Sequence, residues 1–178
     1  KGVGPGKASR IYVGHTRMGL KIYTDGSAIG NIHVTKDTPA GWGFVVVYGG
    51  DSHDSGEHII EKFGKVVTDR NHPLFYGAEV GSNNTGELTA IYETLEWCLE
   101  KKPSEVTVYS DSQYALNVVF GSWTASKNKL LVSNCRALAA KVAILTKVNY
   151  EHIKAHAGYK WNERADRLAY AAAAGESP

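Results

Sequence analysis

Residues 21–31 read KIYTDGSAIGN and place an acidic residue inside a segment that otherwise has the composition of a β-strand. Isoleucine, tyrosine and threonine at 22–24 favour a strand, and the glycines at 26 and 30 favour a turn after it. Aspartate is uncommon in strands, and burying a carboxylate costs free energy unless another group pairs with it. Asp25 therefore lies either in solvent on an edge strand or in a polar site on an inner strand.

The segments around this strand predict an α/β fold. Alternating and β-branched runs predict strands at 20–28, 41–50, 58–67, 105–110 and 147–153. Apolar residues at helical spacing predict helices at 87–102, 112–120, 131–145 and 162–174. The first three strands follow one another through turn-rich pieces, which is typical of an antiparallel meander. The order βββαβααβα predicts a mixed five-stranded sheet with helices on both faces.

The chain of 178 residues is long enough for one domain with its own core, which we expect at 20–178. Lysine and arginine exceed aspartate and glutamate by two, so the net charge neither requires nor excludes a nucleic-acid partner. Cys98 and Cys135 lack the spacing of a zinc or redox motif, which favours a reducing, intracellular setting, either cytoplasm or nucleus. No apolar run is long enough to span a bilayer, so no membrane partner is expected.

Residues 1–19 are rich in glycine and basic residues, which predicts a flexible tail or linker. Within them, GVGPGKAS at 2–9 is superficially similar to a phosphate-binding loop. Its glycine spacing is one residue short, and Ala8 stands where a magnesium-binding serine or threonine is required. We therefore reject a nucleotide-binding loop at this place.

Glu87 is the second acidic residue in an unusual position. It falls along the apolar stripe of its predicted helix rather than on the solvated face. The sequence NTGE at 84–87 could instead form a capping box, with Asn84 as the N-cap residue and Glu87 bonded to its backbone. The local pattern leaves both interpretations open.

Three more residues are candidates for chemistry. Asp111 follows the strand at 105–110, where helix caps and functional sites are both common. Asp166 lies in the first half of the last helix, where a solvated acid would be unremarkable. His156 lies in a glycine-containing loop before that helix, and a lone loop histidine is usually only solvated.

Taken together, Asp25, Glu87, Asp111 and Asp166 predict a metal site. Clustered carboxylates repel one another and lose hydration when buried, so a divalent cation is the usual reason for such a cluster. A set of oxygen ligands selects a hard cation, Mg²⁺ or Mn²⁺. A second acidic group, at Asp51, His53, Asp54 and Glu57, could also be a metal site, but a solvated hairpin tip is the better interpretation.

Four blocks of this sequence resemble the type 1 ribonuclease H family in order and spacing. They are TDGSAIGN at 24–31, SNNTGELTAI at 82–91, VYSDSQYALN at 108–117 and HAGYKWNERADRLA at 156–169. The resemblance extends over residues 20–175 and implies a ribonuclease H-like fold. It implies that the catalytic residues are Asp25, Glu87, Asp111, His156 and Asp166, with the four acids binding two Mg²⁺ ions, which Mn²⁺ can replace.

The same resemblance implies a function and a substrate site. Members of the family hydrolyse the RNA strand of RNA/DNA hybrids and leave 5′-phosphate and 3′-hydroxyl ends. The implied substrate-binding residues are Ser27, Asn31, Asn83, Asn84, Gln113 and Asn162. The alternative is a catalytically silent domain that only binds nucleic acid or scaffolds a larger polypeptide. An integrase-like strand transferase is disfavoured because it would lack the SDSQ and HAG blocks.

The sequence departs from the family pattern in two places. Residues 32–40, IHVTKDTPA, are inserted where many members have a short turn. Residues 121–129, GSWTASKNK, replace a longer basic protrusion and retain Lys127, Lys129 and a tryptophan, Trp123, which either stacks on nucleic acid or packs the loop. This short form is similar to ribonuclease H domains of reverse-transcribing elements. It implies a neighbouring reverse transcriptase or hybrid-binding domain as a partner in a longer chain.

Overall fold

A computed structural model describes residues 19–178 and contains the predicted order of strands and helices. The strands are β1 (Leu20–Ala28), β2 (Ala40–Tyr48), β3 (Glu57–Lys65), β4 (Glu105–Ser110) and β5 (Lys147–His152). The helices are α2 (Asn83–Lys101), α3 (Gln113–Val119), α4 (Lys129–Val142) and α5 (Lys160–Ala174). Residues 1–18, which contain the rejected phosphate loop and all of the predicted tail except Gly19, lie outside the described part of the chain.

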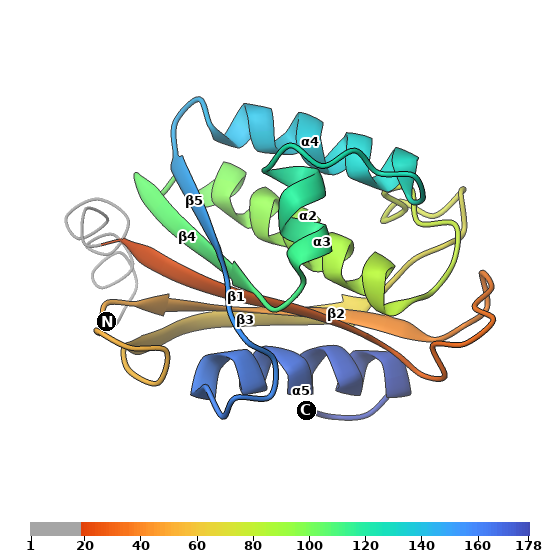
Figure 1. Cartoon of the computed structure of the whole chain (residues 1–178), viewed down its shortest axis with the longest axis horizontal. Helices are drawn as coiled ribbons and strands as arrows, with labels where there is room; N and C mark the ends of the chain where they lie inside the picture. Colours follow the sequence, from red (N-terminus) through yellow and green to blue (C-terminus); the bar gives the residue numbers. More distant parts are fainter. Residues whose placement is uncertain (1–18) are drawn as a thin grey trace.

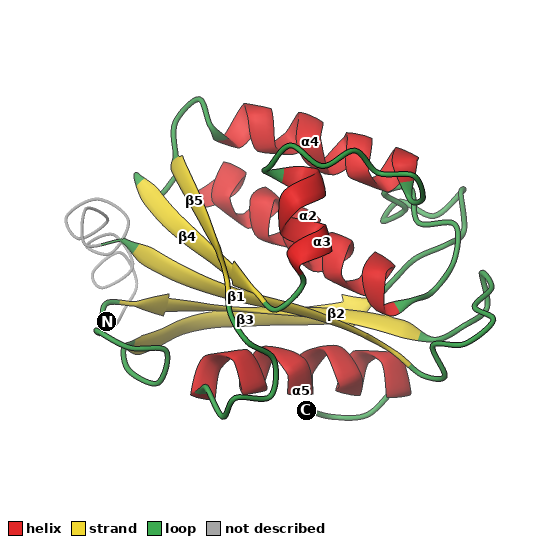
Figure 2. Cartoon of the chain, viewed as in Figure 1, coloured by secondary structure: helices red, strands yellow, loops and turns green. Residues whose placement is uncertain are grey.

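The five strands form one mixed sheet in the order β3-β2-β1-β4-β5. β1, β2 and β3 pair antiparallel as the predicted meander, whereas β4 pairs parallel to both β1 and β5. Helices α2, α3 and α4 cover one face of the sheet and α5 covers the other (Figures 1 and 2). The α/β fold is therefore confirmed, and β1, which carries Asp25, is the central strand.

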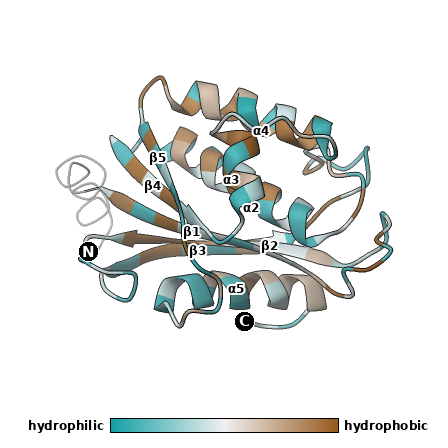
Figure 3. Ribbon diagram, in the orientation of Figure 1, coloured by the Kyte–Doolittle hydropathy of each residue, from teal (hydrophilic) through white to brown (hydrophobic). Residues whose placement is uncertain are grey.

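The two faces of the sheet build two hydrophobic clusters, because successive side chains of a strand point to opposite faces. Ile22 of β1 and Phe44 of β2 belong to the larger cluster, which lies under α2 and α4. Tyr23 and Val45, the next residues along each strand, pack with Leu168 of α5. Figure 3 shows hydrophobic colouring along much of the sheet, and hydrophobic and hydrophilic segments in succession along the helices. Within residues 19–178 no helix is both long enough and apolar enough to cross a membrane.

Two helix ends differ from the predicted bounds, and the structure excludes one of the two interpretations left open for Glu87. The N-cap of α2 is Ser82, whose side chain and that of Thr85 bond reciprocally to each other's backbone, so Asn84 and Glu87 do not form the capping box. The helix therefore starts four residues before Glu87. At the other end of the domain, α4 stops at Val142, and Leu145 is 63% exposed rather than part of the apolar stripe.

Helix α2 lies directly against β1 because both elements carry glycine at the crossing point. A Cβ atom on Gly26 would overlap the backbone nitrogen of Glu87, and one on Gly86 would lie 2.6 Å from the Gly41 carbonyl oxygen. Such distances are far below ordinary van der Waals contact, so any larger side chain would push the helix away. Gly26 directly follows Asp25, and Gly86 directly precedes Glu87. The close contact between the two glycines therefore sets the distance between Asp25 and Glu87.

The insertion at 32–40 folds against the connection between β3 and α2. The Gly81 amide donates to the Thr35 carbonyl oxygen at 3.0 Å, and the Thr68 hydroxyl donates to the Lys36 carbonyl oxygen at 2.8 Å. These bonds join two long loops at the end of the sheet where α2 begins.

Candidate active site

Four elements bring the predicted acids to one small cavity. Asp25 lies in the second half of β1, Glu87 in the second turn of α2, and Asp111 directly after β4. Asp166, on α5, lines the same cavity of about 250 Å³. Carboxylate oxygens of Asp25, Glu87 and Asp111 all lie within 4.8 Å of one another. The cavity lies beside the carboxyl end of β4, which is where sites in parallel sheets are expected.

The acids are buried without basic partners. Asp25 is 4% exposed and Glu87 is 6% exposed. The Gly26 amide donates to Asp25 Oδ1 at 2.9 Å, the Ser110 hydroxyl lies 3.5 Å from Glu87 Oε1, and the two carboxyl groups also interact with each other. Among the described residues, no lysine or arginine forms an ion pair with any of the four acids. No lysine or arginine of the described residues therefore compensates the negative charge of the cluster.

This burial changes the ionisation of the cluster. Burial raises the pKa of Asp25 well above its ordinary value, and the charges of Asp111 and Asp166 raise it further, although a hydrogen bond with Glu87 opposes them. Burial and the neighbouring Asp25 likewise raise the pKa of Glu87 well above its ordinary value. The pKa of Asp111 is raised mainly by burial. A cation in the cavity would reverse these shifts because it favours the charged carboxylates.

The donor set fits a hard divalent cation. It consists of carboxylate oxygens, which are the ligands that Mg²⁺ and Mn²⁺ prefer. Asn162, 3% exposed, lies beside Asp111 and opposes the rise in its pKa, yet its Nδ2 atom makes no hydrogen bond of standard geometry. The amide nitrogen of Asn162 is a hydrogen-bond donor and not a metal ligand, so the carboxylate oxygens of Asp25, Glu87 and Asp111 carry the fit to a cation.

Comparison with known proteins decides the family, since the RNase H family model matches residues 17–174. The chain belongs to the RNase H family. A ribonuclease H of Syntrophomonas wolfei is 35% identical over 159 residues, which cover 83% of this chain and 91% of that protein. A ribonuclease H of Chlorobium phaeovibrioides is 32% identical over 161 residues, covering 84% and 92%.

Solved structures share the RNase H fold. The N-terminal RNase H domain of a Mycobacterium tuberculosis protein has a TM-score of 0.64 at 25% identity, covering 88% of this chain and 94% of that one. LC11-RNase H1 in complex with an RNA/DNA hybrid has a TM-score of 0.60 at 22% identity, covering 88% and 97%. The resemblance drawn from the four sequence blocks is therefore confirmed.

His156 reaches the RNase H cavity from the loop between β5 and α5. Together with Ala155 it lines the cavity, and its positive charge would favour ionised Asp111. Its φ angle of 52° lies in the left-handed region, which is uncommon for a residue with a side chain. The histidine is exposed, as expected for a solvated loop, but its place at the cavity also makes it available for proton transfer.

The expected substrate-binding residues of the RNase H domain divide into two groups. Ser27 and Asn83 line the cavity, and Asn31 Oδ1 accepts from the Asn83 amide at 3.0 Å. Asn162 lies beside Asp111 but is buried. Asn84 and Gln113 are exposed near the starts of α2 and α3 and do not line the cavity. Ser27, Asn31 and Asn83 therefore lie next to the acids, whereas Asn84 and Gln113 lie outside the cavity.

Two further residues of the site were missed in the sequence. Gly26 lines the cavity, and Gly86 allows α2 to approach it. The sequence contains a signal for both residues, because each glycine is adjacent to a predicted acid, in DG at 25–26 and in GE at 86–87. Only the crossing of α2 over β1 shows that these two glycines meet.

The acidic group at residues 51–57 is not a second metal site of this RNase H domain. Among the described residues, the acidic groups that converge closely enough for a metal are Asp25, Glu87 and Asp111. The hairpin is also more than a solvated tip, because Asp54 Oδ1 accepts from the Lys160 amide at 2.7 Å.

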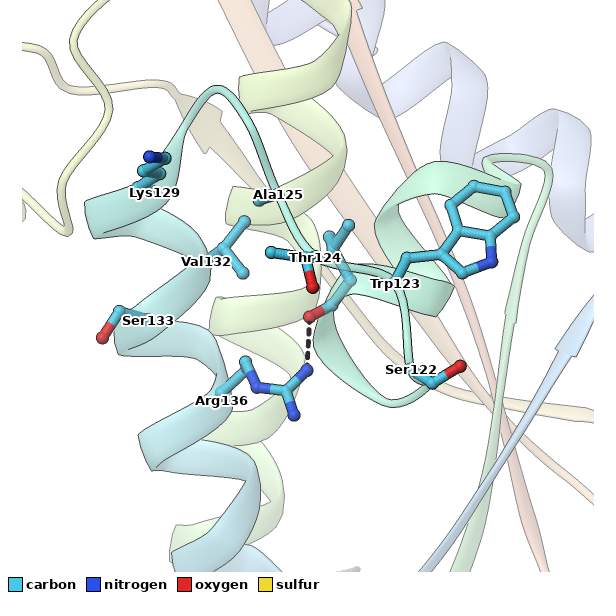
Figure 4. Close-up of a pocket in the computed structure, with 9 residues that line it drawn as sticks. Ser122, Trp123, Thr124, Ala125, Lys129, Val132, Ser133 and Arg136 are labelled. Carbon is cyan, nitrogen blue, oxygen red and sulfur yellow. Dashed lines mark hydrogen bonds between the residues drawn. The ribbon is translucent and has the colours of Figure 1, made fainter.

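The short segment at 121–129 forms one wall of an open groove of about 470 Å³ (Figure 4). The Arg136 side chain of α4 joins this segment to α3, since its Nη1 atom donates to the Val118 carbonyl oxygen of α3 at 2.8 Å and to the Gly121 carbonyl oxygen at 3.4 Å. Trp123 is 48% exposed, and in Figure 4 its indole points away from Arg136 and Val132. The indole is therefore only partly used in packing the loop, and half of its surface is free for another contact.

The acidic cluster leads to a prediction about stability. Replacing Asp25 by asparagine should stabilise the metal-free protein, because burial raises the pKa of this carboxyl and each pKa unit corresponds to about 1.4 kcal/mol. A carboxyl group with a raised folded pKa destabilises the fold when it is ionised, and this penalty fades as the pH falls through the raised value. The stabilisation by Asp25→Asn should therefore be larger at pH 8 than at pH 5.

Thermal melting of the wild type and of Asp25→Asn, in EDTA and in millimolar Mg²⁺, measures this effect. Mg²⁺ should shrink or reverse the advantage of the variant, since the wild type gains more from binding the ion. A lower melting temperature of Asp25→Asn in EDTA would show that hydrogen bonds, rather than an empty cation site, hold Asp25.

Proposed function

We propose that this chain is an endonuclease that hydrolyses the RNA strand of RNA/DNA hybrids with the help of two Mg²⁺ ions, for which Mn²⁺ can substitute. The observation that carries the proposal is the convergence of Asp25, Glu87 and Asp111 on one cavity in a member of the RNase H family. That LC11-RNase H1, which shares the fold, was solved in complex with an RNA/DNA hybrid supports the choice of substrate.

Asp25, Glu87, Asp111 and Asp166 would hold the two ions, which supply an activated water and neutralise the charge that develops on the departing ribose oxygen. The sheet, α2 and α5 hold the acids in fixed places, which would keep a bound phosphodiester in one position within the cavity. His156, on its exposed loop, would move a proton between the leaving oxygen and solvent. The products would carry 5′-phosphate and 3′-hydroxyl ends.

Ser27, Asn31 and Asn83 would recognise the RNA strand. They are neutral hydrogen-bonding side chains beside the acids, and the Ala28 amide holds Asn83 in place by donating to its Oδ1 atom at 2.8 Å. Side chains of this kind can contact the ribose 2′-hydroxyl in the wide minor groove of a hybrid, which is how a protein distinguishes RNA from DNA.

Incubation with labelled RNA/DNA hybrid, duplex DNA and duplex RNA tests the proposal. We expect cleavage of the hybrid alone, on its RNA strand, in Mg²⁺ and not in EDTA. Binding of the hybrid without cleavage in either Mg²⁺ or Mn²⁺ would instead identify a silent binding or scaffolding domain.

The short segment at 121–129 predicts weak substrate binding by the isolated chain. Lys127 and Lys129 are exposed there, but they replace a longer basic protrusion, so few phosphates should be neutralised. For an Asp111→Asn variant, we expect log affinity against log salt to have a slope shallower than about −4. A neighbouring hybrid-binding or reverse transcriptase domain would then supply the missing affinity.

A slope as steep as roughly −6, corresponding to six or seven neutralised phosphates, would contradict this prediction. If Lys7→Ala combined with Arg10→Ala then made the slope shallower, the additional basic surface would lie in the N-terminal residues.

A further inference from the structure

The hairpin between β2 and β3, residues 49–56, caps a helix more than a hundred residues later in the chain. Helix α5 begins at Lys160, and its own N-cap residue, Tyr159, makes no side-chain cap. Asp54 Oδ1 accepts from the Lys160 amide instead, and the Trp161 indole donates to the Ser55 carbonyl oxygen at 2.9 Å. The hairpin thus satisfies a backbone donor that the start of every helix leaves unpaired.

His53 adds an aromatic contact at the same place. Its ring meets Tyr159 edge-on, with centroids 5.0 Å apart, and its Nδ1 atom lies 2.7 Å from the Tyr23 hydroxyl. Burial raises the pKa of Tyr23, so this hydroxyl stays protonated and can donate. Tyr23 is buried on β1 two residues before Asp25. The hairpin therefore connects the strand that carries the first acid to the residue that precedes α5.

The hairpin itself is well ordered by internal hydrogen bonds. The Ser55 hydroxyl accepts from the amides of Asp51 and Ser52 at 2.9 and 3.0 Å. Lys21 of β1 donates to the carbonyl oxygens of Ser52 and Ser55. Because these hydrogen bonds hold the hairpin in place, the hairpin can in turn hold the start of α5 in place.

The hairpin fixes one end of the loop that carries His156. This loop starts after Ile153, which is 4% exposed, and it ends at Tyr159 and Lys160 on the hairpin. Between these ends, residues 155–156 form a turn, and within the described chain residues 154–158 form no backbone hydrogen bond to another strand, helix or loop. The position of His156 at the cavity therefore depends on the two anchors of its loop.

We propose that Asp54 is a positioning residue for His156, an inference that rests on the function proposed above. Asp54 holds the start of α5 and so restricts the loop to conformations in which His156 lines the acidic cavity. Without this cap, the first turn of α5 would fray and the loop would gain length and freedom. The histidine would then spend less time where a proton must be transferred, and turnover would fall.

Proteolysis tests the positioning without relying on activity. Trypsin cleaves after Lys154, which is exposed in the loop, and mass spectrometry identifies the fragment that starts at Ala155. We expect Asp54→Ala to raise the rate of this cleavage about fivefold, as the loss of a helix cap should. Asp54→Asn should keep the wild-type rate, because asparagine caps helices as well as aspartate does.

Glu61→Ala is the matched control. Glu61 of β3 holds α5 one turn further along through a paired contact with Arg164 at 2.9 and 2.6 Å. Its removal also loosens the attachment of α5 to the sheet but leaves the cap and every trypsin site of the loop in place. Cleavage after Lys154 should therefore remain at the wild-type rate. An equal rise in Glu61→Ala, or no rise in Asp54→Ala, would overturn the inference.

Turnover of RNA/DNA hybrid in Mg²⁺ tests the consequence. We expect Asp54→Ala to lower kcat about tenfold with little change in KM. The Asp54→Asn variant should keep the wild-type kcat. His156→Ala should lower kcat about 10²-fold, and adding Asp54→Ala to it should cause no further loss. Fully additive losses would show that Asp54 does not act through His156.

The two readouts separate the inference from the proposed function. A wild type that fails to cleave any hybrid would refute the function, while the proteolysis result would still decide whether Asp54 orders the loop. Active wild type with unchanged kcat in Asp54→Ala would leave the function intact and refute the inference.

Discussion

Asp111→Asn is expected to abolish nearly all hydrolysis of RNA/DNA hybrid while leaving the fold intact. The oxygens of Asp111 lie within 4.8 Å of those of Asp25 and Glu87, so this side chain can share ions with both. Asparagine has nearly the same shape but only one neutral oxygen, and a metal ion held less firmly loses several kcal/mol of transition-state stabilisation. The expected loss in kcat is at least about a thousandfold.

Hybrid cleavage at saturating Mg²⁺ measures the loss, and calorimetric titration with Mg²⁺ measures ion binding independently of activity. Asp69→Asn is a suitable control, because Asp69 is an exposed aspartate in the loop between β3 and α2. It should keep full activity. Turnover of Asp111→Asn above about a tenth of the wild-type value would show that Asp111 is not a metal ligand.

Gly26→Ala is expected to have the largest effect on the fold. The added methyl group would overlap the Glu87 backbone nitrogen and the Gly86 carbonyl carbon. Because both clashing atoms belong to the backbone, α2 must shift as a whole, and overpacking of this kind costs more than about 3 kcal/mol. The shift would also move Glu87 away from Asp25, so the stabilisation by Mg²⁺ should disappear as well.

Chemical denaturation with and without Mg²⁺ measures both effects. Gly175→Ala provides the control, since Gly175 caps α5 at a φ angle of 72° with open space around its Cα. It should cost only about 1 kcal/mol from backbone strain. A similarly small loss in Gly26→Ala, with undiminished Mg²⁺ stabilisation, would mean that the close crossing of α2 and β1 does not set the geometry of the acids.

The sequence by itself determined the family, the order of the elements and the identity of the acids. β1 was predicted with its observed bounds because its strand signal is local and its end is marked by glycine and asparagine. The four acids could be named because each lies in a short block with its own pattern, such as TDGS and SDSQ. Information of this kind is contained within a few neighbouring residues and needs no knowledge of packing.

Helix ends were less predictable because competing caps differ by small local energies. Ser82 and Asn84 are both good N-cap residues, and the packing of α2 against β1 selects Ser82 by placing Glu87 in the cavity. The end of α4 was misplaced for a related reason. Leu145 has the spacing of a core residue, but the chain has already left the helix after Val142.

Only the tertiary structure decided how the separate blocks combine. The sheet order brings β4 beside β1, and the Gly26–Gly86 crossing brings α2 onto β1 and β2, which together bury Asp25 and Glu87 and raise their pKa values. The same is true of Asp54, which looked like part of a solvated turn and caps α5 instead. These contacts join residues far apart in the chain, so their energies depend on strand register and helix packing rather than on local sequence.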